Sequence, residues 1–296
     1  MFGVVNLDKP LGPTSHDMVG LLRRLTGTRR IGHAGTLDPL ASGVLPILVG
    51  AATRFSAELT GGRKRYEAVI RLGERSLTDD AEGPIEAVDA PLPSDSLIHD
   101  ALQSFVGTFE QRPPVFSARK HEGRTAHRAA RAGAPIEVPP RTVTVDSIEV
   151  LGIDRDEHRV DVTIDLRCGA GTYVRSIARD LGERLGTGGH LHALRRTEAA
   201  GLKVADAVTP EALSNLADEG RLSDAILPVG SLLPLPRIDL DADGAWRFAH
   251  GSEQPAPGAP PGPVAVFDAG GDLVGVGRIE AAVLRPDKVV PQDTAS

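Results

Sequence analysis

The chain has 296 residues, enough for one large hydrophobic core and a smaller satellite domain. No apolar run approaches the roughly 20 residues of a membrane span, and the first residues lack the basic and apolar regions of a signal peptide. A single cysteine, Cys168, excludes an internal disulfide framework and fits a reducing compartment, so we expect a cytoplasmic protein.

Charge is distributed unevenly along the chain. The net charge of −7 argues against a nucleic-acid-binding protein when the chain is taken as a whole. Residues 76–100 contain seven acidic residues and no lysine or arginine, so this segment alone accounts for the net charge. Basic residues gather in segments 23–30, 63–65 and 112–131. Solvated arginines would explain any one cluster, but three together favour a basic, RNA-binding face on an acidic protein.

The N-terminal part predicts a strand followed by an amphipathic helix. Residues 4–9 form a short strand that Pro10 ends. Thr14 is a predicted helix N-cap, and Asp17, three residues later, is the acidic partner of a capping box. Apolar residues then recur at helical spacing up to Gly27, which marks the end of the helix.

A glycine-rich turn comes next, with the sequence Gly-His-Ala-Gly-Thr-Leu-Asp-Pro-Leu-Ala-Ser-Gly over residues 32–43. Its glycines permit a tight path and close approach of a ligand, and Pro39 biases Asp38 toward an extended conformation. A carboxylate presented in this way suits a nucleophile or base on a rigid loop. An aspartate that caps a short turn fits the same pattern equally well. The residues by themselves leave both interpretations open.

Several strands are predicted after this turn. Residues 44–49 form an apolar run typical of a buried strand, in which Pro46 implies a bulge or an edge position. Apolar residues alternate with polar ones in residues 66–72, starting at Tyr66, which predicts a strand with one core face. The acidic residues 76–93, which include prolines and a glycine, predict an exposed hairpin or loop.

A second glycine-rich segment ends a strand over residues 160–168 and begins another amphipathic helix. Its sequence, Cys-Gly-Ala-Gly-Thr-Tyr-Val-Arg, places Tyr173 and Arg175 at the helix start. Cys168 fits a small buried apolar residue better than a reactive thiol. From about residue 233 the chain becomes rich in proline and glycine, and two apolar runs flank a Gly-Gly pair as in a β-hairpin.

Three of these segments resemble motifs of the TruB family, the tRNA pseudouridine-55 synthases, and the resemblance covers roughly residues 3–210. It implies an α+β pseudouridine synthase fold, in which a mixed, mostly antiparallel sheet is flanked by helices and followed by a small C-terminal PUA-like β domain. The implied domains are a catalytic domain over residues 1–232, which includes a basic RNA-gripping insertion at 112–133, and a small RNA-binding domain over residues 233–296.

The resemblance also implies roles for single residues. Asp38 would be the catalytic nucleophile, and Arg175 would pair with it. Tyr66 would stack on the target uracil and use its hydroxyl in proton transfer at the sugar. The residues that would hold the flipped-out uridine, besides Tyr66, are His33, Tyr173, Leu194 and Lys9. The role of Leu194 rests wholly on the resemblance, because a leucine in such a position is ordinarily a core residue.

The insertion at 112–133 is implied to grip the T-loop of tRNA. It contains six basic residues and the single acid Glu122, which fits contact with phosphates. Its sequence departs from the family at Phe116 and His127, where the family usually has tyrosine. Phe116 keeps a stacking face but loses a hydroxyl, and the charge of His127 would vary with pH. The side chains expected to contact RNA are those of Arg119, Lys120, Arg124 and Arg128.

The implied reaction isomerises a uridine at position 55 in the T-loop of tRNA, without a cofactor, in a monomeric enzyme that binds the T-arm stem-loop and no membrane. A hydrolytic glycosidase usually needs two carboxylates, and a metal site through His33 and Asp38 lacks further ligands at a recognisable spacing. An RNA-guided relative is disfavoured by the basic insertion. A non-catalytic RNA-binding protein or tRNA-folding chaperone that uses the same basic surface stays open as the alternative.

Overall fold

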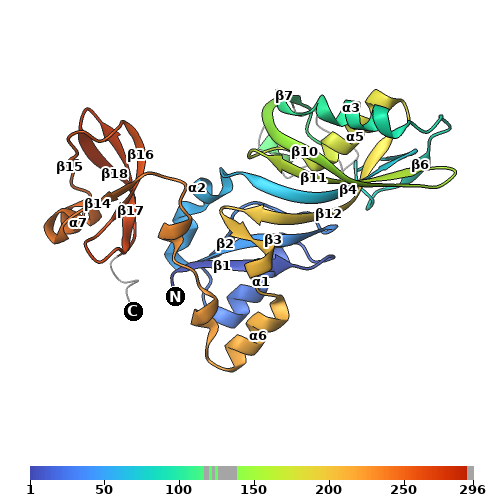
Figure 1. Cartoon of the computed structure of the whole chain (residues 1–296). Helices are drawn as coiled ribbons and strands as arrows, with labels where there is room; N and C mark the ends of the chain where they lie inside the picture. Colours follow the sequence, from blue (N-terminus) through green and yellow to red (C-terminus); the bar gives the residue numbers. More distant parts are fainter. Residues whose placement is uncertain (117–119, 122–123, 126–138, 292–296) are drawn as a thin grey trace. The chain divides into compact units, whose positions relative to one another are not determined.

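The structure is a computed structural model that describes residues 1–116, 120–121, 124–125 and 139–291 (Figure 1). Within these residues, no helix has the length and apolar character that a membrane crossing requires. The chain forms two compact units. Unit 1 contains residues 1–39 and 43–62 and the chain from Ala199 onward, and unit 2 contains residues 40–42 and 63–198.

The N-terminal part of unit 1 is built on three antiparallel strands. Strand β3 (Ala41–Val49) pairs with β1 (Gly3–Lys9) on one side and with β2 (Ile31–His33) on the other. Helix α1 (Ser15–Thr26) connects β1 and β2. The chain after β3 and the chain that returns to unit 1 after Ala199 add short elements to these strands. They are η1 (Gly50–Phe55), α2 (Ser56–Thr60), β13 (Leu202–Lys203), η2 (Val204–Asp206), α6 (Pro210–Asp218), η3 (Leu222–Ala225) and η4 (Val229–Leu232).

Local signals predicted the start of this part well. The Thr14 hydroxyl accepts a hydrogen bond from the Asp17 N–H (3.1 Å), and the Thr14 N–H donates to the Asp17 carboxylate (2.8 Å), which confirms the capping box. Gly27 ends α1 with a φ of 67°, a conformation that glycine adopts without strain.

The sequence predicted a bulge or an edge position at Pro46, and this prediction is wrong. The register between β1 and β3 is unbroken through Pro46, so the strand has no bulge against β1, and β2 lies on its other side. The carbonyl of Pro46 accepts from Ala34 N–H (2.9 Å) just beyond the end of β2. The nitrogen of Pro46 therefore faces the point at which the β2 pairing stops, where the missing N–H breaks no ladder bond.

Unit 1 also contains a five-stranded sheet with the order β14-β16-β17-β18-β15, on which α7 packs. Phe248 of α7 is fully buried against this sheet. A second apolar cluster joins Phe267 and Val276 of the sheet to Val4 and Phe55. The elements are β14 (Arg237–Asp239), α7 (Ala242–Ala249), β15 (Gln254–Pro255), β16 (Gly262–Phe267), β17 (Leu273–Glu280) and β18 (Val283–Val289).

Unit 2 is a sheet with helices on one face. Its strands follow the order β12-β4-β11-β10-β7, and the β4–β11, β11–β10 and β10–β7 pairs are antiparallel. Helices α3 and α5 contact each other and cover the same face of this sheet (Figure 1). The elements are β4 (Lys64–Leu72), α3 (Asp95–Gln103), β7 (Gly107–Gln111), β10 (Arg141–Arg155), β11 (Val160–Cys168), α5 (Val174–Leu185) and β12 (Gly189–Ala199).

Two short hairpins complete the described part of unit 2. One pairs β5 (Glu74–Ser76) with β6 (Ile85–Ala87), and the other pairs β8 (Lys120–His121) with β9 (Arg124–Thr125). Helix α5 packs very closely on the turn before β12, since a Cβ on Gly182 would lie 2.1 Å from the backbone of Gly188. This packing fixes the helix whose first turn carries Tyr173 and Arg175.

Candidate active site

Asp38 lies in unit 1 on a loop whose main chain is bonded on both sides. Before it, the buried Leu37 donates its N–H to Ser15 Oγ (2.8 Å), and the Ser15 hydroxyl donates to the Leu37 carbonyl (2.9 Å). After it, the carbonyl of Pro39 accepts from Gly12 N–H (2.9 Å). The side chain of Asp38 is half-buried. The loop therefore presents this carboxylate from a main chain that the start of α1 already holds in place.

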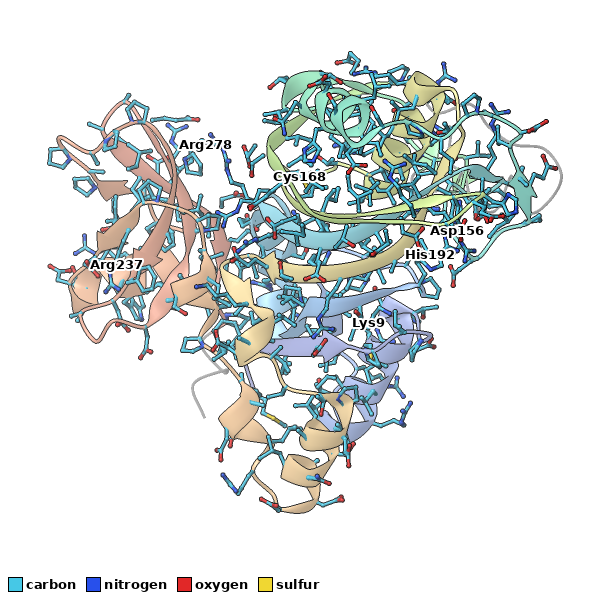
Figure 2. All side chains as sticks on the ribbon, turned by 45° about the vertical axis from the view of Figure 1, so that its right-hand side comes forward. Lys9, Asp156, Cys168, His192, Arg237 and Arg278 are labelled. Atoms are coloured by element: carbon cyan, nitrogen blue, oxygen red, sulfur yellow. The ribbon has the colours of Figure 1, made fainter. Side chains whose placement is uncertain are left out.

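Lys9 fixes the turn that precedes α1. Its ammonium group is fully buried at the end of β1 (labelled in Figure 2) and donates to the carbonyls of Pro10 (2.9 Å) and Pro13 (2.7 Å). A buried ammonium group needs such acceptors, because an isolated charge in an apolar environment is very unfavourable. Lys9 thereby orders residues 10–13, and this turn includes Gly12, which binds the Asp38 loop.

The other predicted uridine-binding residues divide between the units. His33 ends β2 in unit 1 and is half-buried. Tyr66 lies in β4 of unit 2, 8% exposed and opposite Leu166 of β11. Leu194 is half-buried in β12, where the next residue, Arg195, donates to Ser42 Oγ (3.2 Å), just after the Asp38 loop.

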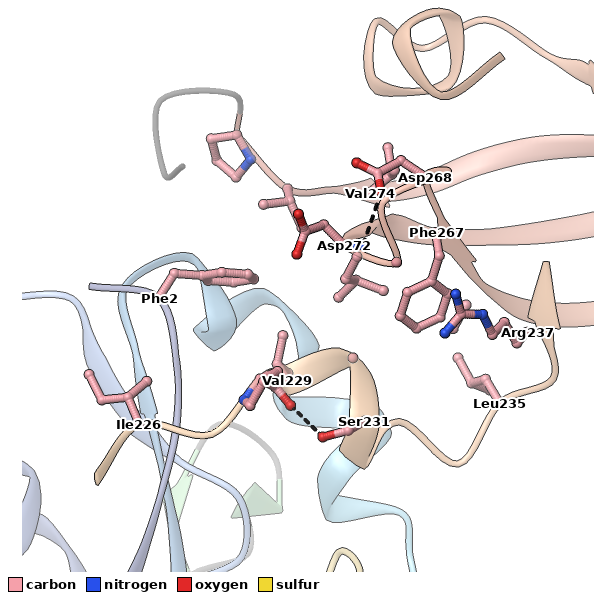
Figure 3. Close-up of a pocket in the computed structure, with 17 residues that line it drawn as sticks. Phe2, Ile226, Val229, Ser231, Leu235, Arg237, Phe267, Asp268, Asp272 and Val274 are labelled. Carbon is pink, nitrogen blue, oxygen red and sulfur yellow. Dashed lines mark hydrogen bonds between the residues drawn. The ribbon is translucent and has the colours of Figure 1, made fainter. Parts of the chain in front are cut away.

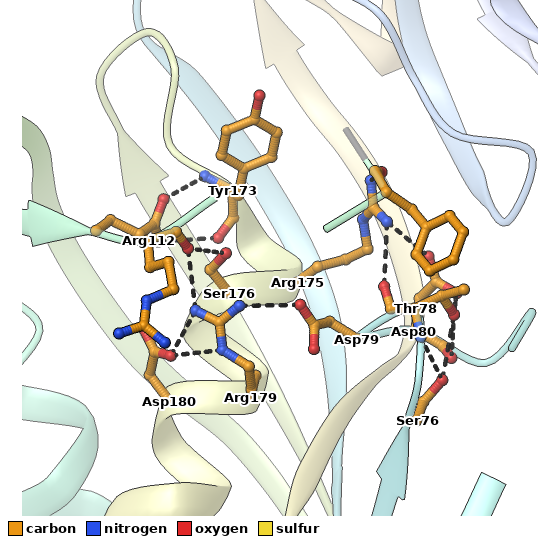
Figure 4. A network of polar contacts seen from close by, with 12 residues as sticks. Ser76, Thr78, Asp79, Asp80, Arg112, Tyr173, Arg175, Ser176, Arg179 and Asp180 are labelled. Atoms are coloured by element: carbon orange, nitrogen blue, oxygen red, sulfur yellow. Dashed lines mark hydrogen bonds and ion pairs between the residues drawn. The ribbon is translucent and has the colours of Figure 1, made fainter. Parts of the chain in front are cut away.

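Arg175 lies in the first turn of α5 and is 7% exposed (Figure 4). Its Nη1 atom lies 3.2 Å from Asp80 Oδ2 and donates to the carbonyl of Thr78 (3.1 Å). Its Nη2 atom donates to the carbonyl of Phe116 (3.0 Å). Asp80 is 3% exposed, so the two charges form a buried ion pair that also joins three chain segments.

The acidic segment around Asp80 is only partly as predicted. The hairpin of β5 and β6 is present, but Asp79 and Asp80 in its connection are buried rather than exposed. The N–H of Ala81 donates to the carbonyl of Leu191 in β12, and the N–H of Leu191 donates to the carbonyl of Asp79, both at 3.0 Å. Burial of both carboxylates is possible because Arg175 and Arg179 of α5 neutralise them.

Arg179 extends the network along α5. Its Nη1 atom lies 3.0 Å from Asp79 Oδ2, and its Nη2 atom lies 2.7 Å from the carboxylate of Asp180 and donates to the carbonyl of Arg112 (3.0 Å) (Figure 4). Burial raises the pKa of Asp79 to about 6, because desolvation outweighs the attraction to Arg179 and Arg175. The carboxyl of Asp79 therefore holds its proton to a higher pH than an exposed aspartate does.

Sequence reasoning missed Gln111, at the end of β7. This side chain is fully buried, and its amide makes two hydrogen bonds to the main chain of Tyr173. Only its place in an alternating strand, at an inward position, could have indicated it. Its partner lies 62 positions later, which no local pattern reveals.

The predicted RNA-binding residues fall in the least described part of the chain. Arg119 and Arg128 lie outside the described residues, as does His127. For Lys120 and Arg124 the structure gives only their strands, β8 and β9. The segment that leads to them, residues 112–116, is described and is bonded to α5 through the carbonyls of Arg112 and Phe116.

Two other features have no part in this site. Cys168 is fully buried, as expected for a cysteine that packs as a small apolar residue, and burial raises the pKa of its thiol to about 11. A cavity of about 870 Å³ in unit 1 is lined by Phe2, Val229, Arg237 and Phe267, among others, but by none of the predicted site residues that the structure describes (Figure 3).

Among the described residues, no three His, Cys, Asp or Glu side chains are grouped so that they could hold a metal ion.

Family models cover almost all of this architecture. Residues 23–174 match the model described as TruB family pseudouridylate synthase (N terminal domain). Residues 175–234 match the tRNA pseudouridylate synthase B C-terminal domain, and residues 236–290 match Pseudouridine synthase II TruB, C-terminal. The chain belongs to the TruB family. It is therefore a pseudouridine-forming isomerase.

Curated relatives in the TruB family resemble the chain over nearly its whole length. The tRNA pseudouridine synthase B of Ralstonia nicotianae is 42% identical over 97% of this chain and 94% of its own. The tRNA pseudouridine synthase B of Thermobifida fusca is 43% identical over 96% of this chain and 97% of its own. At this coverage the matches extend across both units.

Solved structures confirm the TruB fold. The archaeal box H/ACA sRNP Nop10-Cbf5 complex contains a chain with a TM-score of 0.75 and 28% identity, over 99% of this chain and 87% of that one. An H/ACA RNP bound to a substrate RNA containing 2'-deoxyuridine gives a TM-score of 0.76 and 27% identity, over 99% and 86%. The predicted pseudouridine synthase fold and the small C-terminal β domain are confirmed.

Proposed function

We propose that this TruB family member converts uridine 55 in the T-loop of tRNA into pseudouridine, with Asp38 as the nucleophile. The observation that carries the proposal is the Asp38 loop, whose motif matches the family and whose main chain is bonded on both sides of the carboxylate. The relatives named tRNA pseudouridine synthase B support tRNA as the substrate.

The reaction is an isomerisation and needs no external group. The bond between N1 of uracil and C1′ of ribose breaks, the base turns, and a bond forms between C5 and C1′. C5 then loses its proton and N1 gains one, so that atoms and electrons balance. The carboxylate of Asp38 attacks the nucleotide or stabilises the cationic sugar as the first bond breaks.

Other residues complete the proposed mechanism. Extrusion of the target base from its stack costs a few kcal/mol, and stacking on Tyr66 recovers about 1–3 kcal/mol. The Tyr66 hydroxyl moves a proton at the sugar, and Arg175 stabilises the charge of Asp38 once a bound base has excluded water. The residues that hold the uridine in this proposal, besides Tyr66, are His33, Tyr173 and Leu194, and the buried Lys9 contributes by ordering the turn that binds the Asp38 loop.

The RNA is gripped, in this proposal, by the basic insertion at 112–133 through Arg119, Lys120, Arg124 and Arg128. Residues 1–232 act as the catalytic domain, and residues 233–296 act as an accessory RNA-binding domain. The enzyme works as a cytoplasmic monomer on the T-arm stem-loop of tRNA. The basic residues of the insertion favour recognition of tRNA without a guide RNA.

The test compares the parent protein with Asp38→Asn on an unmodified tRNA transcript, with pseudouridine mapped by chemical labelling. The parent should modify position 55, whereas Asp38→Asn should form no product and bind tRNA within a few-fold of the parent. The exposed Asp89 supplies a control, Asp89→Asn, with the same change of charge and full activity expected.

Product from purified Asp38→Asn would exclude the nucleophile, and modification at another uridine would exclude the T-loop assignment. A parent protein that forms no pseudouridine but accelerates tRNA folding would favour the chaperone.

A further inference from the structure

The first turn of α5 carries two of the proposed functional side chains, yet its own sequence does little to hold it. The helix follows a glycine-rich loop, residues 169–172, and its N-cap is Tyr173, which makes no side-chain capping bond. Helix starts leave backbone N–H groups without intrahelical partners, and a tyrosine cannot supply the short oxygen that usually caps them. The position of Tyr173 must therefore be fixed from elsewhere in the chain.

Gln111 supplies this support. Its Oε1 atom accepts from the N–H of Tyr173 (2.9 Å), and its Nε2 atom donates to the carbonyl of Tyr173 (3.0 Å). The same carbonyl accepts from the N–H of Ile177 (3.2 Å), which is a hydrogen bond of the first helical turn. Only a side chain with both an acceptor and a donor can hold both peptide groups of Tyr173, and glutamine has both.

The residues after Gln111 are bonded to the same turn. The carbonyl of Arg112 accepts from Ser176 Oγ (2.8 Å) and from Arg179 Nη2 (3.0 Å). The carbonyl of Phe116 accepts from Arg175 Nη2 (3.0 Å). Side-chain donors from α5 thus bind main-chain acceptors in residues 112–116, the described start of the proposed RNA-gripping insertion. Figure 4 shows these bonds around Ser176 and Arg179.

We propose that Gln111 is a positioning residue for pseudouridine formation, acting through Tyr173. It makes the first turn of α5 and the start of the insertion one rigid frame, so that RNA held by the insertion and the uridine held by Tyr173 share fixed relative positions. This inference rests on the proposed function and adds a residue outside the set implied by the family resemblance. Gln111 does not touch the reacting atoms.

The test is Gln111→Met, which keeps the length of the side chain and removes both hydrogen bonds. The single-turnover rate of pseudouridine formation should fall roughly 10- to 100-fold, because a small displacement of a substrate-holding group has effects of that size. Affinity for tRNA should change less than the rate. Gln103→Met is a control for the same substitution at an exposed site of unit 2, where the Gln103 amide donates to the main-chain carbonyl of Ile148 (3.1 Å).

A double-mutant cycle separates positioning from a general loss of structure. In a Tyr173→Ala background, Gln111→Met should cause little further loss of rate, because the group that it positions is absent. Ser176→Ala, which removes one bond to Arg112, gives a milder variant whose smaller loss should show the same coupling if Gln111→Met does not fold. Melting temperatures are measured for every variant, and rates are compared only below them.

An unchanged rate in folded Gln111→Met, or losses that add fully with Tyr173→Ala, would overturn the inference while the parent enzyme stays active. Equal losses in Gln103→Met would assign the effect to stability and would also overturn it. A parent protein that forms no pseudouridine would overturn the proposed function, and the inference with it.

Discussion

Two groups of arginines in this protein have opposite surroundings. Arg175 and Arg179 on α5 are largely buried, and each is paired with a carboxylate and bonded to main-chain carbonyls. The second group, at and after the end of α1, is exposed: it consists of Arg23, Arg24, Arg29 and Arg30. In the part of the chain that the structure describes, no carboxylate forms an ion pair with any of these four.

The difference between the two groups shows that the number of basic residues in a segment does not measure its ability to bind RNA. A guanidinium group that already neutralises a buried carboxylate has few donors left for phosphates, and removing it leaves a buried charge. An exposed guanidinium group near neutral partners only, such as Arg30 beside Thr53 Oγ1 (3.1 Å), keeps its charge available for a phosphate. We therefore expect loss of a buried arginine to affect folding and catalysis, and loss of an exposed one to affect binding.

The largest effect is expected for Arg175→Met. The variant leaves Asp80 buried without its partner, which costs roughly 3–5 kcal/mol of folding free energy, and it removes the proposed support for Asp38. Both the melting temperature and the single-turnover rate should fall strongly. Arg24→Gln, from the exposed group, should stay within about 0.5 kcal/mol of the parent in stability. Equal stability of the two variants would remove the distinction between the groups.

A smaller effect is expected from the pH dependence of Asp79. Burial raises the pKa of its carboxyl from an ordinary 3.8 to about 6, so between these pH values the folded protein holds a proton that the unfolded chain has lost. The free energy of unfolding should therefore decrease as pH rises through this window, by at most roughly 3 kcal/mol from this group.

Chemical denaturation at several pH values between 4 and 7 measures this effect. Asp79→Asn should flatten the dependence, because asparagine does not titrate, whereas Asp89→Asn at an exposed position should leave it as in the parent. A parent-like slope in Asp79→Asn would show that another group binds the proton.

The smallest effect is expected when Arg24, Arg29 and Arg30 are changed together to glutamine. Affinity for tRNA should fall about tenfold at moderate salt, and the slope of log K against log salt should decrease by roughly 0.7–0.9 for each phosphate that the protein no longer neutralises. The rate at saturating enzyme should be unchanged.

A matched triple variant controls for net charge, since it removes three charges from exposed arginines that are already paired with carboxylates and lie outside the proposed RNA-binding segments: Arg155, Arg159 and Arg221. If both triple variants lower the slope of log K against log salt equally, the exposed arginines at and after the end of α1 have no special role in RNA binding.

Local features of the fold followed from the sequence, and distant contacts did not. The capping box of Thr14 and Asp17 was predictable because both partners lie within one helical turn. Asp79 and Asp80 were expected in an exposed segment because their neighbours are acidic, and the arginines that bury them lie 100 and 95 positions later. The fold itself came from motif resemblance, since alternation and helical spacing give elements but not their pairing.

The order of the chain within unit 1 has a consequence for biosynthesis. This unit is built from the first 62 residues and from the chain after residue 198, and its strand β1 is bonded to the returning chain at Leu227 and Val208. On the ribosome, the bonds from β1 to Val208 and Leu227 therefore cannot form until the whole of residues 63–198 has been made, which takes on the order of ten seconds at typical elongation rates. Unit 2 is continuous apart from residues 40–42, so it is the part that can fold first.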